Sequence, residues 1–366
     1  MAQSIVLAQQ IHVDSLPINH IQTIGSHNSY RKPMDKRILG AIRLLDLFYG
    51  KNPSPAQQLE YVHLPFDQQF ETYGIRGLEI DIHYDPEGGR YFRTKGNIIG
   101  AKKSGPNEQE MQQPGLKVFH ISDVDFNSHY PTFKKALMAV KSWSDAHPRH
   151  LPIYILVEPK EDGVGNHVKA FGFVPVLPFD SAALESIDHE IREVFAGDLQ
   201  HILTPDDVRG KHATLNEAIL TQGWPLLAEA RGKVVFIMNG SLRHTELYAQ
   251  NHPSFRGRMM FSFSEVGRED AAFIKIDDAF SLDIAAMVQQ GYMVRTRTDS
   301  PGYEAPINDH RTKNAAFLSG AQLLSTDYYL ADKQLSPYRV GFENNQVGRL
   351  NFMQPASVHV GDWLEK

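Results

Sequence analysis

Short apolar stretches that end abruptly in polar residues recur along this sequence. Four of them are rich in β-forming residues and finish in histidine, amide or acidic side chains: residues 24–30, 78–83, 118–122 and 155–160. A parallel barrel brings the carboxyl ends of its strands to one mouth. The pattern therefore predicts four strands whose polar ends share one site.

The stretch at residues 78–83 shows why such strand ends are unusual. Its apolar residues occupy the even positions, whereas Glu79, Asp81 and His83 occupy the odd ones, so the two groups lie on opposite faces of a strand. In a barrel one face packs on helices and the other points inward, where charges are costly unless they serve a ligand. We therefore interpret the odd positions as part of a functional site.

The rest of the chain continues the alternation of strand and helix patterns. Further strands are expected at residues 234–238, 259–263, 292–298 and 322–325. Apolar residues at helical spacing predict helices between strands, at residues 38–49, 64–73, 133–143, 184–195, 282–288 and 315–318. The fold class predicted is α/β: a single (β/α)8 TIM-like barrel with long insertions after strands 2 and 4. Residues 1–366 are expected to form one domain, with a core at about 20–330 and a C-terminal extension at 331–366.

Composition narrows the function classes. A hydrophobic fraction of 42% and a charged fraction of 22% are ordinary for a globular protein, and a net charge of −6 without a basic run argues against nucleic-acid binding. The absence of cysteine excludes disulfides and thiolate metal sites. Residues 1–8 lack the basic region and long apolar stretch of a signal peptide. We expect a secreted or periplasmic protein whose signal peptide is absent from this chain, with a cytoplasmic location as the alternative.

Three carboxylates and one amide would converge at the predicted mouth: Asn28, Glu79, Asp81 and Glu158. Carboxylates that meet without a cation repel one another, and an all-oxygen ligand set selects a hard cation, Ca²⁺ or Mg²⁺, over zinc. The alternative is that Glu79 and Asp81 are salt-bridged residues of the rim.

Two histidines, His27 and His120, would flank this cation. One imidazole can protonate a leaving oxygen, while the other, when cationic, stabilises the charge of a pentacoordinate phosphorus. Lys160, Arg295 and Arg297 are candidates for neutralising phosphate oxygens, and Asp299 lies on the same strand face as the two arginines.

The residues resemble the Ca²⁺-dependent phosphatidylinositol-specific phospholipases C, in the bacterial and fungal branch of the PLC-like phosphodiesterase barrels. The resemblance spans residue 22 to about residue 355. It is carried by residues 25–30 (GSHNSY), 77–81 (GLEID), 119–120 (FH), 158–160 (EPK), 204–210 (TPDDVRG), 223–225 (GWP), 294–299 (VRTRTD) and 319–329 (SGAQLLSTDYY).

The resemblance implies a metal-dependent phosphodiesterase that cleaves phosphatidylinositol to diacylglycerol and a cyclic inositol phosphate. Its metal ligands would be Asn28, Glu79, Asp81 and Glu158, with Ca²⁺ expected rather than Mg²⁺. Attack by the inositol 2-hydroxyl would be assisted by Glu79 or Glu158 as base. His120 would protonate the leaving oxygen and His27 would stabilise the transition state.

Other activities remain as alternatives to this reading. One is a phosphodiesterase of the same barrel class that acts on glycerophosphodiesters or soluble inositol phosphates. Another is a catalytically silent barrel that binds anionic lipid. The loop at residues 300–310 carries an inserted-looking Ser-Pro-Gly beside the expected substrate region, which bears on substrate choice. We expect a monomer that contacts a membrane surface transiently and does not bind nucleic acid.

Overall fold

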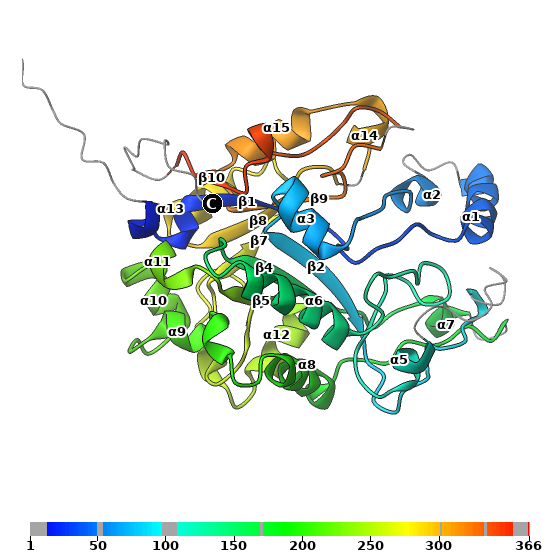
Figure 1. The fold of residues 1–366 in the computed structure, drawn as a ribbon, viewed down its shortest axis with the longest axis horizontal. Coiled ribbons are helices and arrows are strands. Elements are labelled where there is room, and N and C mark those ends of the chain that lie inside the picture. Colours follow the sequence, from blue (N-terminus) through cyan, green and yellow to red (C-terminus); the bar gives the residue numbers. More distant parts are fainter. Residues whose placement is uncertain are drawn as a thin grey trace, which may run out of the picture.

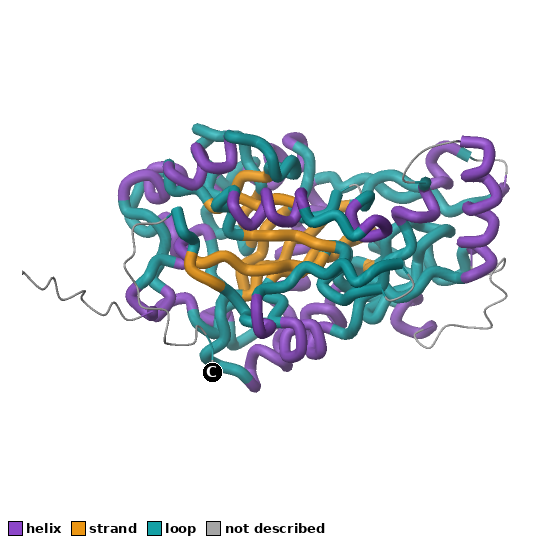
Figure 2. Tube along the Cα trace, turned by 90° about the horizontal axis from the view of Figure 1, so that it is seen from above, coloured by secondary structure: helices purple, strands orange, loops and turns teal. Residues whose placement is uncertain are grey.

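Eight parallel strands form a barrel with helices around its wall (Figure 1; Figure 2). The computed structural model describes residues 13–49, 54–96, 108–168, 171–300, 302–332, 335–353 and 365, so residues 1–8 lie outside it. The barrel strands are β1 (Ile21–Ser26), β2 (Gly77–His83), β4 (Ile153–Pro159), β5 (Val234–Met238), β6 (Met260–Ser262), β7 (Phe273–Lys275), β8 (Met293–Arg297) and β9 (Leu323–Thr326). They are ordered β6-β5-β4-β2-β1-β9-β8-β7, and a parallel bridge between Phe263 and Phe273 joins the two outer strands. The predicted (β/α)8 architecture is confirmed.

Two strands differ from the prediction. The stretch at residues 118–122 is not a barrel strand, because β3 (Lys117–Val118) pairs antiparallel with the end of β2. β1 pairs only with the first two residues of β2, Gly77 and Leu78. The other end of the same edge of β2 pairs with β3 instead. The sequence analysis also missed β7, although β6, which is equally short, was recognised. The prediction therefore had eight strands, as the barrel has, but it included one stretch that is not a barrel strand and omitted β7.

Amphipathic helices cover the outside of the barrel. In α6 the buried residues Phe133, Ala136, Leu137 and Val140 follow the helical spacing, and the side chain of Thr132 caps the first turn. The helices are α1 (Lys36–Tyr49), α2 (Pro55–Gln58), α3 (Phe66–Tyr73), α5 (Glu108–Gln112), α6 (Phe133–Ala146), α7 (Val164–His167), α8 (Ser181–Val194), α9 (Pro205–Arg209), α10 (Leu215–Thr221), α11 (Leu227–Ala230), α12 (Leu242–Ala249), α13 (Asp283–Gln289), α14 (Glu304–Ile307) and α15 (Arg311–Leu318). No helix in the described ranges has the length and apolar character needed to cross a bilayer.

The insertions gather on one side of the barrel. α1 and α2 follow β1, α5 lies in the insertion after β2, and α7 lies in the insertion after β4; all four are grouped at the right of Figure 1. Parallel strands place their carboxyl ends at one rim, so segments that follow these strands extend from that rim. The predicted insertions after strands 2 and 4 are confirmed, and they surround the mouth.

A close approach between two glycines sets the spacing of β1 and β2. Gly25 and Gly77 are paired in register, and a Cβ added to Gly77 would lie 2.9 Å from Gly25 Cα. No side chain therefore fits between the strands at this level. The contact brings the chain that leaves β1 against β2, where the Ser29 backbone N–H donates to the Glu79 carbonyl oxygen at 2.9 Å.

The C-terminal segment packs against the barrel strands. β10 (Arg349–Leu350) pairs antiparallel with β1, and the Glu365 carboxylate accepts hydrogen bonds from Arg76 and from the Leu151 backbone N–H. Residues on both sides of the undescribed range 354–364 thus contact the barrel.

A buried carboxylate holds the base of the insertion that follows β2. Oε1 of Glu190, on α8, accepts a 2.8 Å hydrogen bond from the Leu116 backbone N–H, while Oε2 has no hydrogen-bond partner among the described residues. Burial raises the pKa of Glu190 to about 7, against the opposing effects of the Leu116 bond and the charges of Lys134 and Lys117. The folded chain therefore favours the neutral acid.

We predict that Glu190→Gln removes a pH-dependent loss of stability. Between the ordinary pKa of 4.5 and the folded value of about 7, the folded chain binds more protons than the unfolded chain, so this residue lowers stability as pH rises. From pH 5 to pH 8 the wild type should lose up to about 3 kcal/mol of unfolding free energy relative to the variant. Urea unfolding at both pH values measures the difference. Glu185→Gln, on the exposed part of the same helix, is the control, and equal pH slopes for wild type and Glu190→Gln would contradict the assignment.

Candidate active site

Three carboxylates cluster at the mouth of the barrel. Asp81 of β2 and Glu158 of β4 are directly opposite in the parallel register, and Glu79 lies two residues before Asp81 on the same face. One oxygen of each carboxylate lies within 4.8 Å of the others. The strand ends that were predicted from the sequence to share one site therefore lie close together in the structure.

Positively charged and amide groups surround this cluster. Arg295 Nη2 donates to Glu79 Oε2 at 2.9 Å from across the barrel, and Lys160 Nζ lies 3.0 Å from Glu158 Oε1. The amide nitrogen of Asn239 bridges Glu79 Oε1 (3.3 Å) and Glu158 Oε2 (3.0 Å), while its oxygen accepts a 2.9 Å bond from Lys275. Burial would raise the pKa of Glu79, but the charges of His27, Arg295, Arg297 and Lys275 hold it below its usual value.

Asp81 is the incompletely satisfied member of the cluster. Both of its carboxylate oxygens are buried and lack a close hydrogen-bond partner in the described structure, and Lys160 Nζ is 3.5 Å from Oδ2. Burial raises the pKa of Asp81 well above its usual value, and the charges of Glu158 and Glu79 add to the effect. A buried carboxylate of this kind needs a counter-charge, so the site fits a divalent cation with oxygen ligands.

Asn28 completes the oxygen donor set on the β1 side. Its φ of 51° lies in the left-handed region, which asparagine adopts more readily than most residues. The amide nitrogen donates to Tyr61 Oη at 2.7 Å, which leaves the amide oxygen for a cation. The predicted ligand set of Asn28, Glu79, Asp81 and Glu158 therefore satisfies the donor chemistry of Ca²⁺.

A chain of charged groups holds His27. Its Nδ1 is 2.7 Å from Asp327 Oδ1, and Arg297 Nη2 donates to Asp327 Oδ2 at 2.7 Å. Burial would raise the pKa of Asp327, but Arg297 and His27 together hold it far below the usual value. With Nδ1 occupied, the other ring nitrogen is directed to the carboxylates, where Nε2 lies 3.5 Å from Glu79 Oε1.

His120 is held by a tight turn rather than by the end of a barrel strand. Its backbone N–H donates to the Asp125 carbonyl at 3.1 Å, and its Nδ1 lies 3.0 Å from Asp125 Oδ2. Burial lowers the pKa of His120, and the bond to Asp125 opposes this effect. The expectation that His120 reaches the mouth on a parallel strand is wrong, because β3 belongs to the hairpin that follows β2.

Both histidines line one cavity of about 470 Å³ at the mouth. Its wall is formed by His27, Pro55, Gln58, Leu59, Tyr61, Glu79, His120, Ile121, Glu158, Lys275, Asp277, Arg295, Arg297, Ser300 and Asp327. The cavity thus combines two imidazoles, two of the clustered carboxylates and three cationic side chains. Such a combination suits the transfer of a proton at a phosphodiester.

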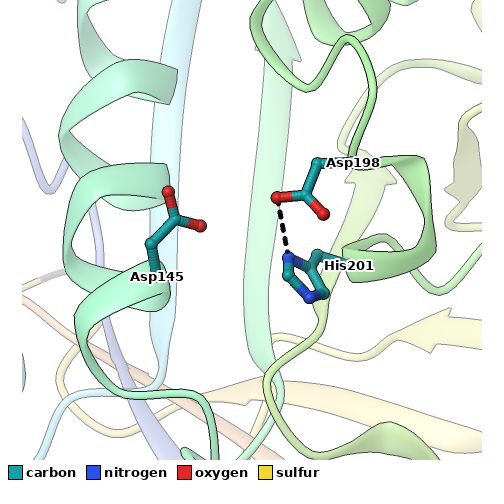
Figure 3. A group of neighbouring side chains, drawn as sticks. All are labelled: Asp145, Asp198 and His201. Carbon is teal, nitrogen blue, oxygen red and sulfur yellow. Dashed lines mark ion pairs between the residues drawn. The ribbon is translucent and has the colours of Figure 1, made fainter.

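A second acidic group with a histidine lies on the outside of the barrel (Figure 3). It consists of Asp145 on α6, Asp198 and His201, whose Nδ1 lies 3.0 Å from Asp198 Oδ2. Lys141 already neutralises both aspartates, at 2.8 Å from Asp145 Oδ2 and 2.9 Å from Asp198 Oδ2. We therefore read this group as an ion-pair network that ties α6 to the segment after α8.

Sequence comparison identifies the family. A family model described as phosphoinositide phospholipase C, Ca²⁺-dependent, matches residues 16–352. The chain belongs to this family. It is accordingly an enzyme of the phosphoric diester class, and Ca²⁺ is the cofactor on which the family depends. No curated protein sequence matches the chain.

Solved structures agree with the phospholipase C fold. A calcium-dependent phosphoinositol-specific phospholipase C from Pseudomonas sp., in its apo form, superposes with a TM-score of 0.53 at 15% identity, covering 93% of this chain and 98% of that one. A Ca²⁺-dependent phosphatidylinositol-specific phospholipase C from Streptomyces antibioticus gives a TM-score of 0.51 at 18% identity, covering 86% and 95%. At such identities the likeness shows the shared barrel fold.

The predicted substrate-binding residues of this phospholipase C occupy different depths. Arg295 and Arg297 line the cavity, whereas Lys160 faces the carboxylate cluster. Asp299 is fully buried, accepts a 3.1 Å bond from the Asp327 backbone N–H, and lies 3.6 Å from Arg297. This placement suits support of the Arg297–Asp327 pair rather than contact with a substrate.

Several residues of the site escaped the sequence reading. Asn239 and Asp327 directly follow strands that were recognised, so the strand-end criterion would have found them if applied to every strand. Lys275 and Asp277 belong to the strand that was missed. Tyr61 comes from a loop without a periodic pattern, and no signal in the sequence points to it.

We predict that Asp81→Asn separates calcium binding from folding. The substitution removes a buried charge, so the calcium-free variant should be at least as stable as the wild type, while its calcium affinity should fall at least about tenfold. Calcium at a hundred times its Kd stabilises a protein by about 2.7 kcal/mol, and about half of this gain or more should be lost. Calorimetric titration and thermal melts in chelator and in calcium give both quantities. Exposed Asp162→Asn is the control, and wild-type affinity in Asp81→Asn would refute its role as a ligand.

Proposed function

We propose that this enzyme cleaves phosphatidylinositol to diacylglycerol and a cyclic inositol phosphate, through attack of the inositol 2-hydroxyl on phosphorus. The observation that carries the proposal is the pair of carboxylate-anchored imidazoles, His27 and His120, on one cavity with a carboxylate cluster. Two imidazoles held in this way would supply an acid and a charge stabiliser on either side of a phosphodiester.

The proton of the attacking hydroxyl would pass to a carboxylate of the cluster. Glu158 is better placed than Glu79, because its side chain is 27% exposed whereas that of Glu79 is 2% exposed. Glu79 also has a lowered pKa, which makes it a weaker base. Asn28, Glu79, Asp81 and Glu158 would hold Ca²⁺, which when bound lowers the pKa of the hydroxyl and shields phosphate charge.

The two histidines would have different tasks. As the bond from the 2-hydroxyl oxygen to phosphorus forms, the bond to the diacylglycerol oxygen breaks, and His120 would give that oxygen its proton. His27, held by Asp327, would carry positive charge beside the phosphoryl oxygens. Water would open the cyclic product with the proton transfers reversed.

The charge pattern of the cavity supports a headgroup that carries a single phosphate. The three cations that line it in the described structure already have partners: Lys275 bonds to Asn239, Arg295 to Glu79 and Asp277, and Arg297 to Asp327. A further ring phosphate would have to compete with these carboxylates for its counter-charge. Ring hydroxyls, in contrast, can both donate to the carboxylates and accept from the cations.

A lipid substrate requires contact with a bilayer, and α1 is the element that we propose for it. Leu44 and Leu45 of this helix are 59% and 55% exposed, and Lys36 and Arg37 lie at its start. The helix extends from the mouth side, next to α2, whose Pro55 and Gln58 line the cavity (Figure 1). Exposed leucines with adjacent basic residues suit the interface of an anionic membrane.

We predict that His27→Ala and His120→Ala each lower turnover of phosphatidylinositol at least about a hundredfold. Phosphorus NMR of vesicle digests, with and without chelator, identifies the headgroup product and shows whether a cyclic ester forms. His189→Ala, an exposed histidine of α8, is the control. Near-normal rates in either active-site variant would defeat the assigned roles. A wild type that binds vesicles without turnover would instead indicate a silent lipid-binding barrel.

We predict that the double variant Leu44→Ser/Leu45→Ser acts at the membrane alone. Loss of two apolar side chains from the interface should lower turnover on vesicles about tenfold or more, with turnover of a monomeric short-chain substrate unchanged. Leu318→Ser, at the exposed end of α15 on the opposite side of the barrel, is the control. Equal losses on both substrates would argue that α1 shapes the cavity rather than the membrane contact.

A further inference from the structure

A buried arginine contacts the two segments that position Asn28 and His120 in the proposed site. Arg31 is fully buried and follows His27 and Asn28 in the turn after β1, where its backbone N–H donates to the Asn28 carbonyl at 3.0 Å. Its guanidinium makes three side-chain hydrogen bonds, to Asp125 and to the carbonyl oxygens of Leu59 and Tyr61. One cation therefore joins three separate segments of the chain.

The first branch from this guanidinium leads to His120. Arg31 Nε donates to Asp125 Oδ2 at 2.5 Å, and the same oxygen is 3.0 Å from His120 Nδ1. Asp125 Oδ1 has no hydrogen-bond partner among the described residues, so the orientation of the carboxylate depends on the oxygen that Arg31 and His120 share. The direction of the His120 ring is thus set through Arg31.

The second branch leads to Asn28. Arg31 lies over the Tyr61 ring, with Cζ 4.3 Å from the ring centroid, and also holds the Tyr61 carbonyl. Tyr61 Oη accepts the 2.7 Å hydrogen bond from the Asn28 amide nitrogen. That bond decides which atom of the amide is available to a cation, so the loop that Arg31 fixes also orients the proposed ligand.

A planar guanidinium is suited to this double task. Its donors point in fixed directions and it stacks on aromatic rings, whereas a lysine ammonium is a point charge on a flexible chain. A lysine at this position would keep the charge opposite Asp125, but it could not reach Asp125 and both carbonyl oxygens with the same geometry. Arg31→Lys therefore tests geometry with little change in charge.

We propose that Arg31 is a positioning residue that keeps the calcium ligand Asn28, through Tyr61, and the acid His120, through Asp125, in one fixed arrangement. The inference rests on the proposed function, because it gives Asn28 and His120 the roles assigned there. It adds that metal binding and proton donation share a single anchor that touches neither the metal nor the substrate.

Three single variants test this anchor: Tyr61→Phe, Asp125→Asn and Arg31→Lys. For each one, calorimetric titration with Ca²⁺ gives the metal Kd without any need for turnover, and kcat at saturating Ca²⁺ on phosphatidylinositol in mixed micelles reports on proton donation. Arg311→Lys, whose side chain is exposed on α15, is the control for the arginine exchange. Thermal melts exclude loss of folding.

The expected result is a crossed pattern. Tyr61→Phe should weaken calcium binding about tenfold and should lower kcat less than Asp125→Asn does, since Asp327 still holds His27 although the Tyr61 hydroxyl 3.4 Å from its Nδ1 is lost. Asp125→Asn should lower kcat at least about tenfold, with the calcium Kd within about twofold of wild type. Arg31→Lys should reproduce both losses. A merely structural arginine would instead give parallel losses of affinity and rate in all three variants.

Wild-type values of both quantities in Arg31→Lys would overturn the proposal, as would parallel losses in all three variants. Should Arg31→Lys fail to fold, the other two variants decide: Tyr61→Phe must act mainly on the calcium Kd and Asp125→Asn mainly on kcat, and parallel losses in those two refute the anchor. Failure of the proposed function is recognised separately, because the wild type itself would then show no turnover of phosphatidylinositol in the presence of calcium.

Discussion

Repulsion among three closely spaced carboxylates, two of them buried, is the constraint on which the rest of this site depends. Glu79, Asp81 and Glu158 approach within 4.8 Å, and an uncompensated buried charge costs several kcal/mol. Arg295, Lys160 and the Asn239–Lys275 pair offset much of this cost. The remaining deficit falls on Asp81, where a divalent cation is the matching counter-charge. The cationic side chains of the mouth are thus already paired with anionic residues of the site before any phosphate binds.

Compensation of this kind requires a closed barrel. The carboxylates come from neighbouring strands β2 and β4, whereas Lys275 and Arg295 come from β7 and β8 on the other side of the strand order. The Arg295–Glu79 bond therefore crosses the interior, and its formation depends on pairing that runs through β1 and β9. The charge balance of the carboxylate cluster and the pairing of these strands are energetically linked for this reason.

The part of this site that depends on the alternation of residues along a β-strand could be predicted from the sequence. The alternation of residues 78–83 places Glu79 and Asp81 on one face whatever the tertiary details, and Glu158 lies within β4 opposite Asp81. Asn28 lies beyond the end of β1, in a turn that parity does not describe. Parity is a weak signal in three-residue strands, of which β6 was recognised and β7 was missed. Nor does it describe groups that reach the site from loops, such as Tyr61 and Arg31, whose positions depend on contacts between segments distant in sequence.

His120 lines the cavity although the element assigned to it from the sequence was wrong. A strand end and a tight turn both expose a side chain at the rim, and the apolar run before His120 fits either one. The difference matters for the chemistry, because a barrel strand would fix the imidazole through pairing on both edges. In the turn, one carboxylate must do so, and Asp125 is itself fixed by Arg31. In the proposed mechanism the acid therefore depends on a buried ion pair in a segment that belongs to an insertion, whereas the proposed metal ligands on β2 and β4 depend on the barrel. Arg31 lies where the two meet, directly after β1, and for that reason one side chain can keep both parts of the reaction in register.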